Sequence, residues 1–245
     1  MARASLPAGT ARDFYRSLGE SAVEFLAICR GEHEPLAHVH LDDPTRARLD
    51  ELLRNRTPVI LATSHTGNWD LTACAVARDY PLTVLTKSLH AEGVDRIWQS
   101  TRASFGVDLV RAETGAFTTL RRAAASGRMV AVMIDQAPID QESAERVPFL
   151  GETAFVDRAA GLLAASTNGI VLVIGARRDG RETRVSILEE LARCENEATR
   201  DFVSRVTHRA TLALDAFVRA HPDSWLWLHR RWKTPPKRRA TLEAT

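Results

Sequence analysis

The feature that most constrains the fold of this 245-residue chain is a repeated alternation between short apolar runs and longer segments with helical periodicity. The runs VILAT, MVAVMI and IVLVI carry almost no polar side chains. Such strands are typical of a parallel sheet whose two faces are both covered. Strands that alternate with helices therefore predict an α/β sandwich: a single domain with a largely parallel central sheet flanked by helices.

The individual elements follow from apolar spacing and from the turn residues between them. Segment 135–152 has two prolines and no clear period, so we predict a loop there. The chain divides into an N-terminal helical segment (1–56), an α/β core (57–234) and a basic C-terminal tail (235–245). The predicted strands are 58–63, 82–86, 107–110, 129–134, 170–177 and 183–188; the predicted helices are 10–29, 43–55, 68–79, 91–105, 114–126, 157–167 and 195–220.

Targeting and redox signals are sparse. The longest strongly apolar stretch, 170–176, is far shorter than the roughly 20 residues that cross a bilayer, and the N-terminus does not resemble a signal peptide. Cys29, Cys74 and Cys194 are odd in number and far apart, so we expect neither a disulfide framework nor a structural zinc site. We therefore expect a cytoplasmic protein that would meet a membrane only from its surface.

The segment SHTGNWD follows the first strand of the core, where α/β folds bind their ligands. His65 would leave the strand end, and Asp70 would lie in the first turn of the next helix. Across this corner the carboxylate can fix the imidazole tautomer and leave the other nitrogen free to take a proton. This arrangement suits acyl transfer to a hydroxyl that the substrate supplies. Alternatively, Asp70 is only a favourable acid at a helix N-terminus and His65 a core histidine.

Other polar side chains are expected near the same edge of the sheet. Asp135 and Gln136 end the fourth core strand, Lys87 follows the second, and Arg102 lies on the helix after it. The two cations could hold an anion or could be ordinary solvated surface, and Asp135 could be a cap.

The segment HPDSWLWLHRRWK near the C-terminus combines tryptophans with basic residues. This combination suits a membrane interface or a nucleic-acid groove, or it packs its tryptophans into the core. Lys237, Arg238 and Arg239 extend a basic tail that could meet anionic lipid.

Taken together, these motifs resemble the bacterial lipid A biosynthesis late acyltransferases and the related phosphatidylinositol mannoside acyltransferases, within the wider lysophospholipid acyltransferase group. The landmarks occur in family order and span most of the chain. They are SHTGNWD (64–70), a helix ending in Arg102 followed by Phe105-Gly106, VMIDQ (132–136) with VPFLG (147–151), and HPDSWLWLHRRWK (221–233).

The resemblance implies an acyltransferase in which His65 acts as general base and Asp70 orients it. The implied donor is an acyl thioester on acyl carrier protein or coenzyme A, serving as co-substrate, and the acceptor is a hydroxyl of a lipid or glycolipid. No cofactor is implied, and the sequence lacks the HExxH pattern of a catalytic metal site. The enzyme would act peripherally at the cytoplasmic face of the inner membrane. The expected substrate-binding residues are Asn68, Lys87, Arg102, Asp135 and Gln136.

The sequence departs from the family pattern in three places. Many members have Glu where this chain has Asp70, and the usual N-terminal transmembrane anchor is not seen. The helix 10–29 and the Trp-Arg segment are then the candidates for membrane contact. The Asn-rich segment that follows the second strand in lipid A enzymes is missing around residues 88–90, which weakens lipid A as the expected acceptor.

Two other functions remain open from the residues alone. A hydrolase could use Ser64 beside His65, although adjacent strand residues point to opposite sides and no G-x-S-x-G elbow is present. An Arg-rich module could bind nucleic acid or another anionic surface. Against this stand a net charge of only +2 and basic residues that are dispersed except at the tail, so we expect no nucleic-acid partner.

Overall fold

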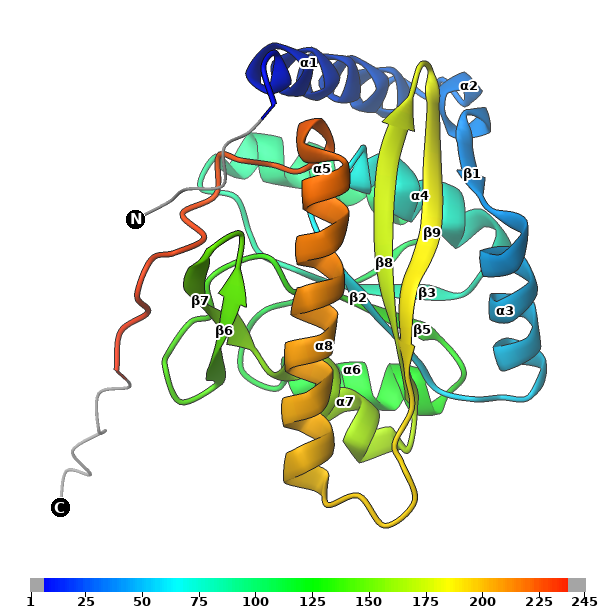
Figure 1. Ribbon diagram of the computed structural model, residues 1–245. Coiled ribbons are helices and arrows are strands. Elements are labelled where there is room, and N and C mark those ends of the chain that lie inside the picture. Colours follow the sequence, from blue (N-terminus) through cyan, green and yellow to red (C-terminus); the bar gives the residue numbers. More distant parts are fainter. Residues whose placement is uncertain (1–6, 238–245) are drawn as a thin grey trace, which may run out of the picture.

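The computed structural model describes residues 7–237 and shows a seven-stranded sheet in the order β1-β9-β8-β2-β5-β3-β4 (Figure 1). All neighbouring strands are parallel except β8 and β9. The prediction of an α/β fold with a largely parallel sheet is confirmed. The strands are β1 (Val39–Leu41), β2 (Val59–Thr63), β3 (Leu82–Thr86), β4 (Asp108–Arg111), β5 (Met129–Met133), β6 (Ala144–Phe149), β7 (Glu152–Asp157), β8 (Ile170–Asp179) and β9 (Glu182–Leu191).

Helices cover both faces of this sheet. The helices are α1 (Thr10–Cys29), α2 (Glu34–Ala37), α3 (Asp43–Arg54), α4 (Trp69–Asp79), α5 (Glu92–Ser104), α6 (Ala116–Ala125), α7 (Ala159–Thr167) and α8 (Thr199–Ala220), followed by a 3-10 turn η1 (Pro222–Ser224).

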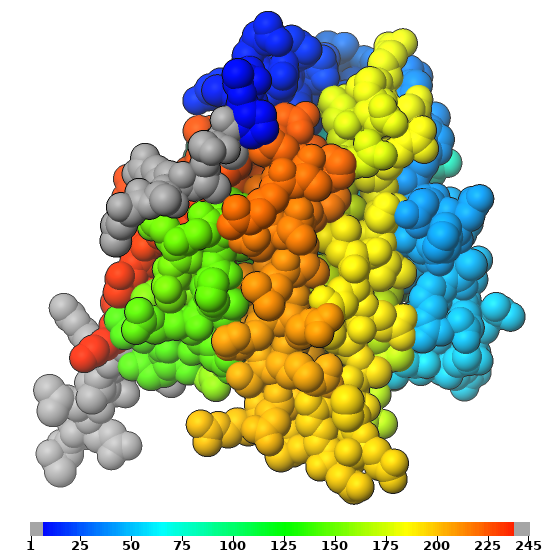
Figure 2. All heavy atoms as spheres, in the orientation of Figure 1, coloured from blue at the N-terminus to red at the C-terminus, as the bar shows by residue number. Residues whose placement is uncertain are grey.

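The two faces of the sheet belong to two separate apolar clusters, because successive side chains of a strand point to opposite faces. On β2, Ile60 packs with α6, α7 and α8, whereas Leu61 packs with α3 and α4. Helix α8 lies across one face, between the β6–β7 hairpin and the β8–β9 strands, as the space-filling view shows (Figure 2). Both faces of the central strands are thus buried, as their uniformly apolar sequences predict.

The helix starts that border the site depend on side-chain caps. Asp42 caps α3, its carboxylate accepting a hydrogen bond from the Thr45 amide at 2.9 Å. Asn68 caps α4 by accepting from the Leu71 amide at 3.1 Å. Its amide nitrogen donates to Glu24 on α1 at 2.8 Å. A cap of this kind typically stabilises a helix by about 1 kcal/mol.

The predicted loop at 135–152 is wrong in its second half. Residues from β6 pair with β7 in an antiparallel hairpin, with Pro148 opposite Thr153. Proline removes a ladder donor and is tolerated only where a strand has a free edge, as in this two-stranded unit. Strands β8 and β9 also extend beyond their predicted ends, and α2 and β1 were not predicted.

The tryptophan-rich segment after α8 packs into the core rather than onto an outer surface. Trp225 is fully buried against Phe149, and Trp227 and Trp232 pack against the same cluster. Arg231 is 1% exposed and donates to the Phe155 carbonyl. These residues are therefore not available to a membrane or a nucleic acid, whereas Arg238 and Arg239 of the predicted tail lie outside the described residues.

Within residues 7–237, no helix is long and apolar enough to cross a membrane.

Candidate active site

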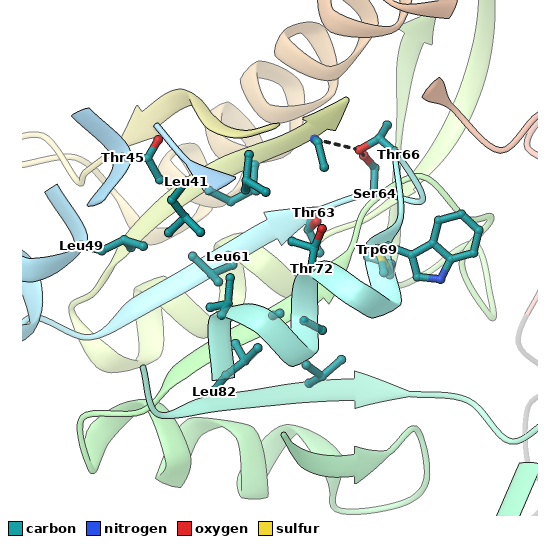
Figure 3. A pocket seen from close by; sticks show the side chains of 18 residues that line it. Leu41, Thr45, Leu49, Leu61, Thr63, Ser64, Thr66, Trp69, Thr72 and Leu82 are labelled. Atoms are coloured by element: carbon teal, nitrogen blue, oxygen red, sulfur yellow. Dashed lines mark hydrogen bonds between the residues drawn. The ribbon is translucent and has the colours of Figure 1, made fainter. Parts of the chain in front are cut away.

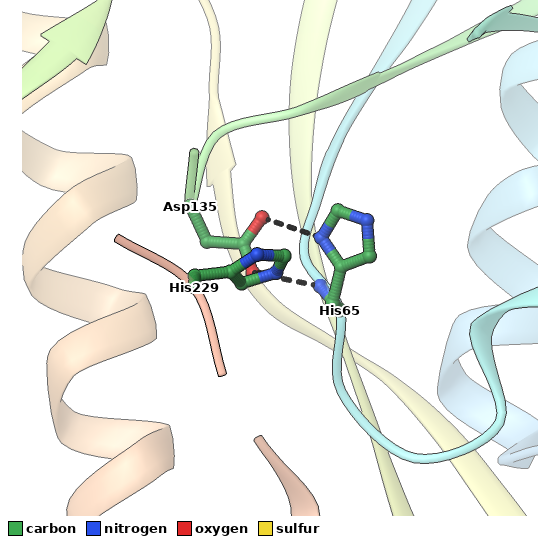
Figure 4. Close-up of side chains that lie close together, drawn as sticks. All are labelled: His65, Asp135 and His229. Carbon is green, nitrogen blue, oxygen red and sulfur yellow. Dashed lines mark hydrogen bonds and ion pairs between the residues drawn. The ribbon is translucent and has the colours of Figure 1, made fainter. Parts of the chain in front are cut away.

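His65 and Asp135 lie side by side because they follow neighbouring parallel strands. Thr63 of β2 pairs with Met133 of β5, and each of the two site residues lies two positions further on. The Nδ1 atom of His65 is 3.0 Å from Oδ1 of Asp135, and the His65 amide donates to Oδ2 at 2.9 Å (Figure 4). The indole Nε1 of Trp225 donates to the same Oδ2 at 3.0 Å. Three hydrogen bonds thus hold one carboxylate.

Asp135 is fully buried and stays ionised. Burial by itself would raise the pKa of Asp135, but the neighbouring His65, acting electrostatically and through hydrogen bonds, lowers that pKa below its usual range. An ionised carboxylate only accepts hydrogen bonds, so His65 must carry its proton on Nδ1. The Nε2 atom is then an acceptor, and its partner is the side-chain amide nitrogen of Gln136 at the long distance of 3.5 Å. The pairing with Asp135 thus fixes the orientation of the His65 imidazole.

Asp70, the predicted partner of His65, is engaged elsewhere. Its carboxylate accepts from the indole of Trp98 at 2.9 Å and lies 3.6 Å from Nη1 of Arg102. Burial raises the pKa of Asp70 above its usual value, although Arg102 and Trp98 act in the opposite direction. The sequence-based assignment of Asp70 as the orienting residue is corrected here: Asp135 occupies Nδ1 of His65.

The predicted substrate-binding residues divide into two groups. Lys87, Arg102 and Gln136 line one cleft of about 300 Å³ together with His65 and Asp70. Lys87 donates to the side-chain oxygen of Gln136 at 3.2 Å. Arg102 is 8% exposed and donates to Thr86 at 2.9 Å, and burial lowers its pKa.

Asn68 and Asp135 do not line this cleft. Asn68 is 3% exposed, and both ends of its amide contact other parts of the protein. Its contribution is to fix the start of α4 against α1. Asp135 contacts the cleft only through its hydrogen bonds to His65, which does line it.

His229 is a residue of the site that the sequence did not single out. Its ring centroid lies 4.5 Å from that of His65, and its Nε2 is 3.7 Å from Oδ2 of Asp135 (Figure 4). Burial lowers the pKa of His229 to about 4, so the ring is neutral at pH 7. The sequence offered only its place in the tryptophan-rich segment, and nothing in that pattern shows that the segment returns to the end of β2.

A second, apolar cavity of about 70 Å³ adjoins the cleft on the α4 side of the sheet (Figure 3). Trp69 lines both spaces, and its ring centroid lies 5.1 Å from that of His65. From Trp69 the lining extends between α4 and the sheet to Leu41 and Leu49. The cavity thus offers an apolar environment beside His65.

Ser64 does not have the geometry of a nucleophile activated by His65. Its side chain is buried, and its hydroxyl lies 3.2 Å from the hydroxyl of Thr66. It lines the apolar cavity and not the cleft. This arrangement disfavours the hydrolase alternative.

Residues 12–234 match the family model described as bacterial lipid A biosynthesis acyltransferase. A curated relative, a phosphatidylinositol mannoside acyltransferase of Mycolicibacterium smegmatis, is 23% identical over 177 residues. The aligned part is 71% of this chain and 56% of the relative, so the chain spans little more than half of that protein's length. Because the family model covers most of the chain, this protein belongs to the bacterial lipid A biosynthesis acyltransferase family.

Proposed function

We propose that this protein is an O-acyltransferase that moves a fatty acyl chain from an acyl thioester to a hydroxyl of a lipid or glycolipid. Family membership supports acyl transfer to a lipid acceptor in general. The observation that carries the proposal is the His65–Asp135 pair, which opens onto a polar cleft and lies beside an apolar cavity.

In the proposed mechanism, Nε2 of His65 takes the proton of the acceptor hydroxyl while the hydroxyl oxygen attacks the thioester carbonyl. The new C–O bond forms, the C–S bond breaks, and the thiolate leaves and recovers the proton from His65. Asp135 holds the imidazole in the required tautomer and stabilises the imidazolium that forms. No nucleophile from the protein is needed, in keeping with the buried Ser64.

The two spaces beside His65 suit the two ends of an acyl thioester. The apolar cavity suits the acyl chain, because burying methylene groups there removes them from water. Trp69 borders both spaces, so we expect its indole to turn aside when the chain enters. Lys87 and Arg102 place positive charge along the cleft and suit the anionic part of a donor or acceptor.

We further propose that the enzyme works peripherally at the cytoplasmic face of the inner membrane, with α1 as the contact. One side of α1 packs inward through Phe14 and Ile28, and Glu24 pairs with Arg178 at 2.6 Å. The opposite side exposes an apolar row, of which Tyr15, Val23 and Leu26 are each 60% exposed or more. Exposed arginines accompany this row at Arg12, Arg16 and Arg30.

The test of the proposal is a transfer assay with acyl-coenzyme A and with acyl-acyl carrier protein as separate donors. Membrane lipid extracts serve as acceptors, and mass spectrometry identifies the lipid that gains an acyl chain. His65→Ala should abolish the product, because it removes the imidazole that Asp135 holds at the cleft. Undiminished transfer by this variant would refute the mechanism, and release of free fatty acid alone would indicate a hydrolase.

A further inference from the structure

Three potential metal ligands converge at the end of β2 and β5. One ligand atom each from His65, Asp135 and His229 lies within 4.8 Å of the other two (Figure 4). They come from three segments far apart in the sequence, and two of them line the cleft. Two imidazoles and one carboxylate form a ligand set that suits zinc and other borderline divalent metals.

The Nε2 atom of His229 is one of several buried polar atoms of the described residues without a hydrogen-bond partner, and it is the one that belongs to this cluster. It is buried and has no hydrogen-bond partner among residues 7–237. The nearest charged oxygen, Oδ2 of Asp135, lies 3.7 Å away, which is beyond hydrogen-bonding distance. Buried polar atoms of native proteins nearly always have a partner, so this nitrogen calls for one.

The carboxylate has room for a metal without losing its other contacts. Oδ2 of Asp135 accepts from the His65 amide and from Trp225, and both bonds can stay in place. Oδ1 accepts only the Nδ1 proton of His65 in this part of the structure. A cation that takes the place of this proton would bind Oδ1 and Nδ1 together, with Nε2 of His229 as the third ligand.

We propose that His65, Asp135 and His229 form a zinc-binding site, and that Zn²⁺ bound there switches off the catalytic base. The metal binds the lone pair of Nδ1 and displaces the proton from that nitrogen, and the neutral imidazole of His65 then carries its one proton on Nε2. That nitrogen can then no longer accept the hydroxyl proton. No electron is transferred, and a chelator reverses the change. The inhibition rests on the proposed function of His65, whereas the binding itself does not.

The site should discriminate among cations. Zn²⁺ accepts imidazole and carboxylate in a four-coordinate arrangement, which leaves one position for water or substrate from the cleft. Mg²⁺ requires six oxygen ligands in near-ideal octahedral geometry, which this ligand set does not provide. Zinc, and not magnesium, should therefore bind.

The binding test uses the full chain, freed of metal, and a chromogenic chelator that competes for Zn²⁺. His229→Gln should weaken zinc binding at least tenfold, because it removes one of three ligands. The matched control is His40→Gln, which alters the separate histidine–carboxylate cluster of His38, His40 and Glu182. This control should bind zinc as the wild type does, and unfolding curves should show that both variants are folded.

The outcomes separate the site from adventitious binding. Zinc binding that His229→Gln leaves intact, or that His40→Gln removes, would overturn the proposal. In the transfer assay, Zn²⁺ should inhibit the wild type, a chelator should restore activity, and the same concentration of Mg²⁺ should have no effect. Loss of transfer on chelation alone would mean that a metal assists catalysis, and would also overturn it. If no transfer is detected with any donor, the proposed function fails, while the binding comparison still decides the zinc site.

Discussion

The indole Nε1 of Trp225 donates a hydrogen bond to Oδ2 of Asp135 at 3.0 Å, the same oxygen that accepts from the backbone amide of His65. A tryptophan of the C-terminal segment thereby fixes the carboxylate that pairs with Nδ1 of His65. Hydrogen bonds to a buried charge are stronger than those between neutral groups, and they are costly to remove.

Trp225→Phe should therefore lower the free energy of unfolding by about 1.5–3 kcal/mol. The phenyl ring keeps most of the packing and removes the donor to Asp135. Trp227→Phe is the control, because the Trp227 indole donates to the neutral carbonyl of Pro222. Loss of this hydrogen bond should lower the free energy of unfolding by only about 0.5–1.5 kcal/mol. If urea unfolding shows the same decrease in unfolding free energy for both variants, the hydrogen bond from Trp225 to Asp135 has no special role.

The two buried aspartates of the site should differ sharply in their effects on catalysis. Asp135→Asn favours the wrong tautomer of His65, and the comparable change in serine proteases lowers kcat by roughly 10⁴-fold. Asp70→Asn leaves Nδ1 of His65 paired with Asp135, so the decrease in kcat should be much smaller. The main effect should be on KM, because Asp70 pairs with the cleft residue Arg102. Steady-state kinetics on both variants measure this, and a greater loss of kcat in Asp70→Asn would restore Asp70 as the orienting residue.

The apolar cavity should limit the length of the acyl chain. Leu49 on α3 lies at the end of the cavity remote from Trp69, so Leu49→Phe should shift the preference toward shorter donors. Leu53→Phe, on the same helix but outside the lining, serves as the control. Transfer rates for a series of acyl-coenzyme A lengths give the readout, and an unchanged preference in Leu49→Phe would place the chain elsewhere.

His38 should stabilise the fold in acid and neutral solution and lose this effect in base. Hydrogen bonds that the imidazole donates to Glu182, and then to Glu34, raise the pKa of His38. The stabilisation is fully present below the unfolded pKa of about 6.5 and disappears as the pH rises through the raised folded pKa. The difference in unfolding free energy between wild type and His38→Gln should therefore be larger at pH 5.5 than at pH 9. A difference that grows toward pH 9 would contradict the assignment.

Attachment to membranes should depend on both charge and the exposed row of α1. The wild type should float with anionic vesicles at low salt and less well at high salt, because salt screens the arginines. Replacing Tyr15, Val23 and Leu26 with Ser should reduce flotation further. Leu212→Ser is the control, since Leu212 is a comparably exposed apolar residue on α8. If the protein floats equally well with neutral and with anionic vesicles at every salt concentration, the arginines do not contribute to attachment.

The sequence predicted the class of fold because its strands and helices carry local signals. Uniformly apolar strands and capped helices can be recognised without tertiary information. The β6–β7 hairpin was not predicted, because Pro148 and the charged residues near it interrupt the apolar pattern of its strands. Its strands gain their stability by packing under α8.

The sequence predicted only part of the site, because contacts between distant segments of the chain leave no local pattern. His65 was found because it leaves a strand end, but Asp70 was chosen as partner because it is near in sequence. Asp135 is the actual partner because β2 and β5 are neighbours in the sheet, and strand order is not encoded in any local pattern. His229 is still further from His65 in the sequence, and no local pattern shows that the chain returns to the site at this residue.

The loop that carries His65 is completed by the far end of the chain: Thr66 forms a bridge with Trp225, and the Leu226 amide donates to the His65 carbonyl at 2.9 Å. A protein is synthesised from its N-terminus at about 5–20 residues per second. While residues 224–231 are still inside the ribosome, β2 and β5 can already exist, but the carboxylate lacks its indole and the loop lacks its partner. The hydrogen bonds that Trp225 and Leu226 make to Asp135 and to the His65 loop can therefore form only after residues 224–231 have left the ribosome.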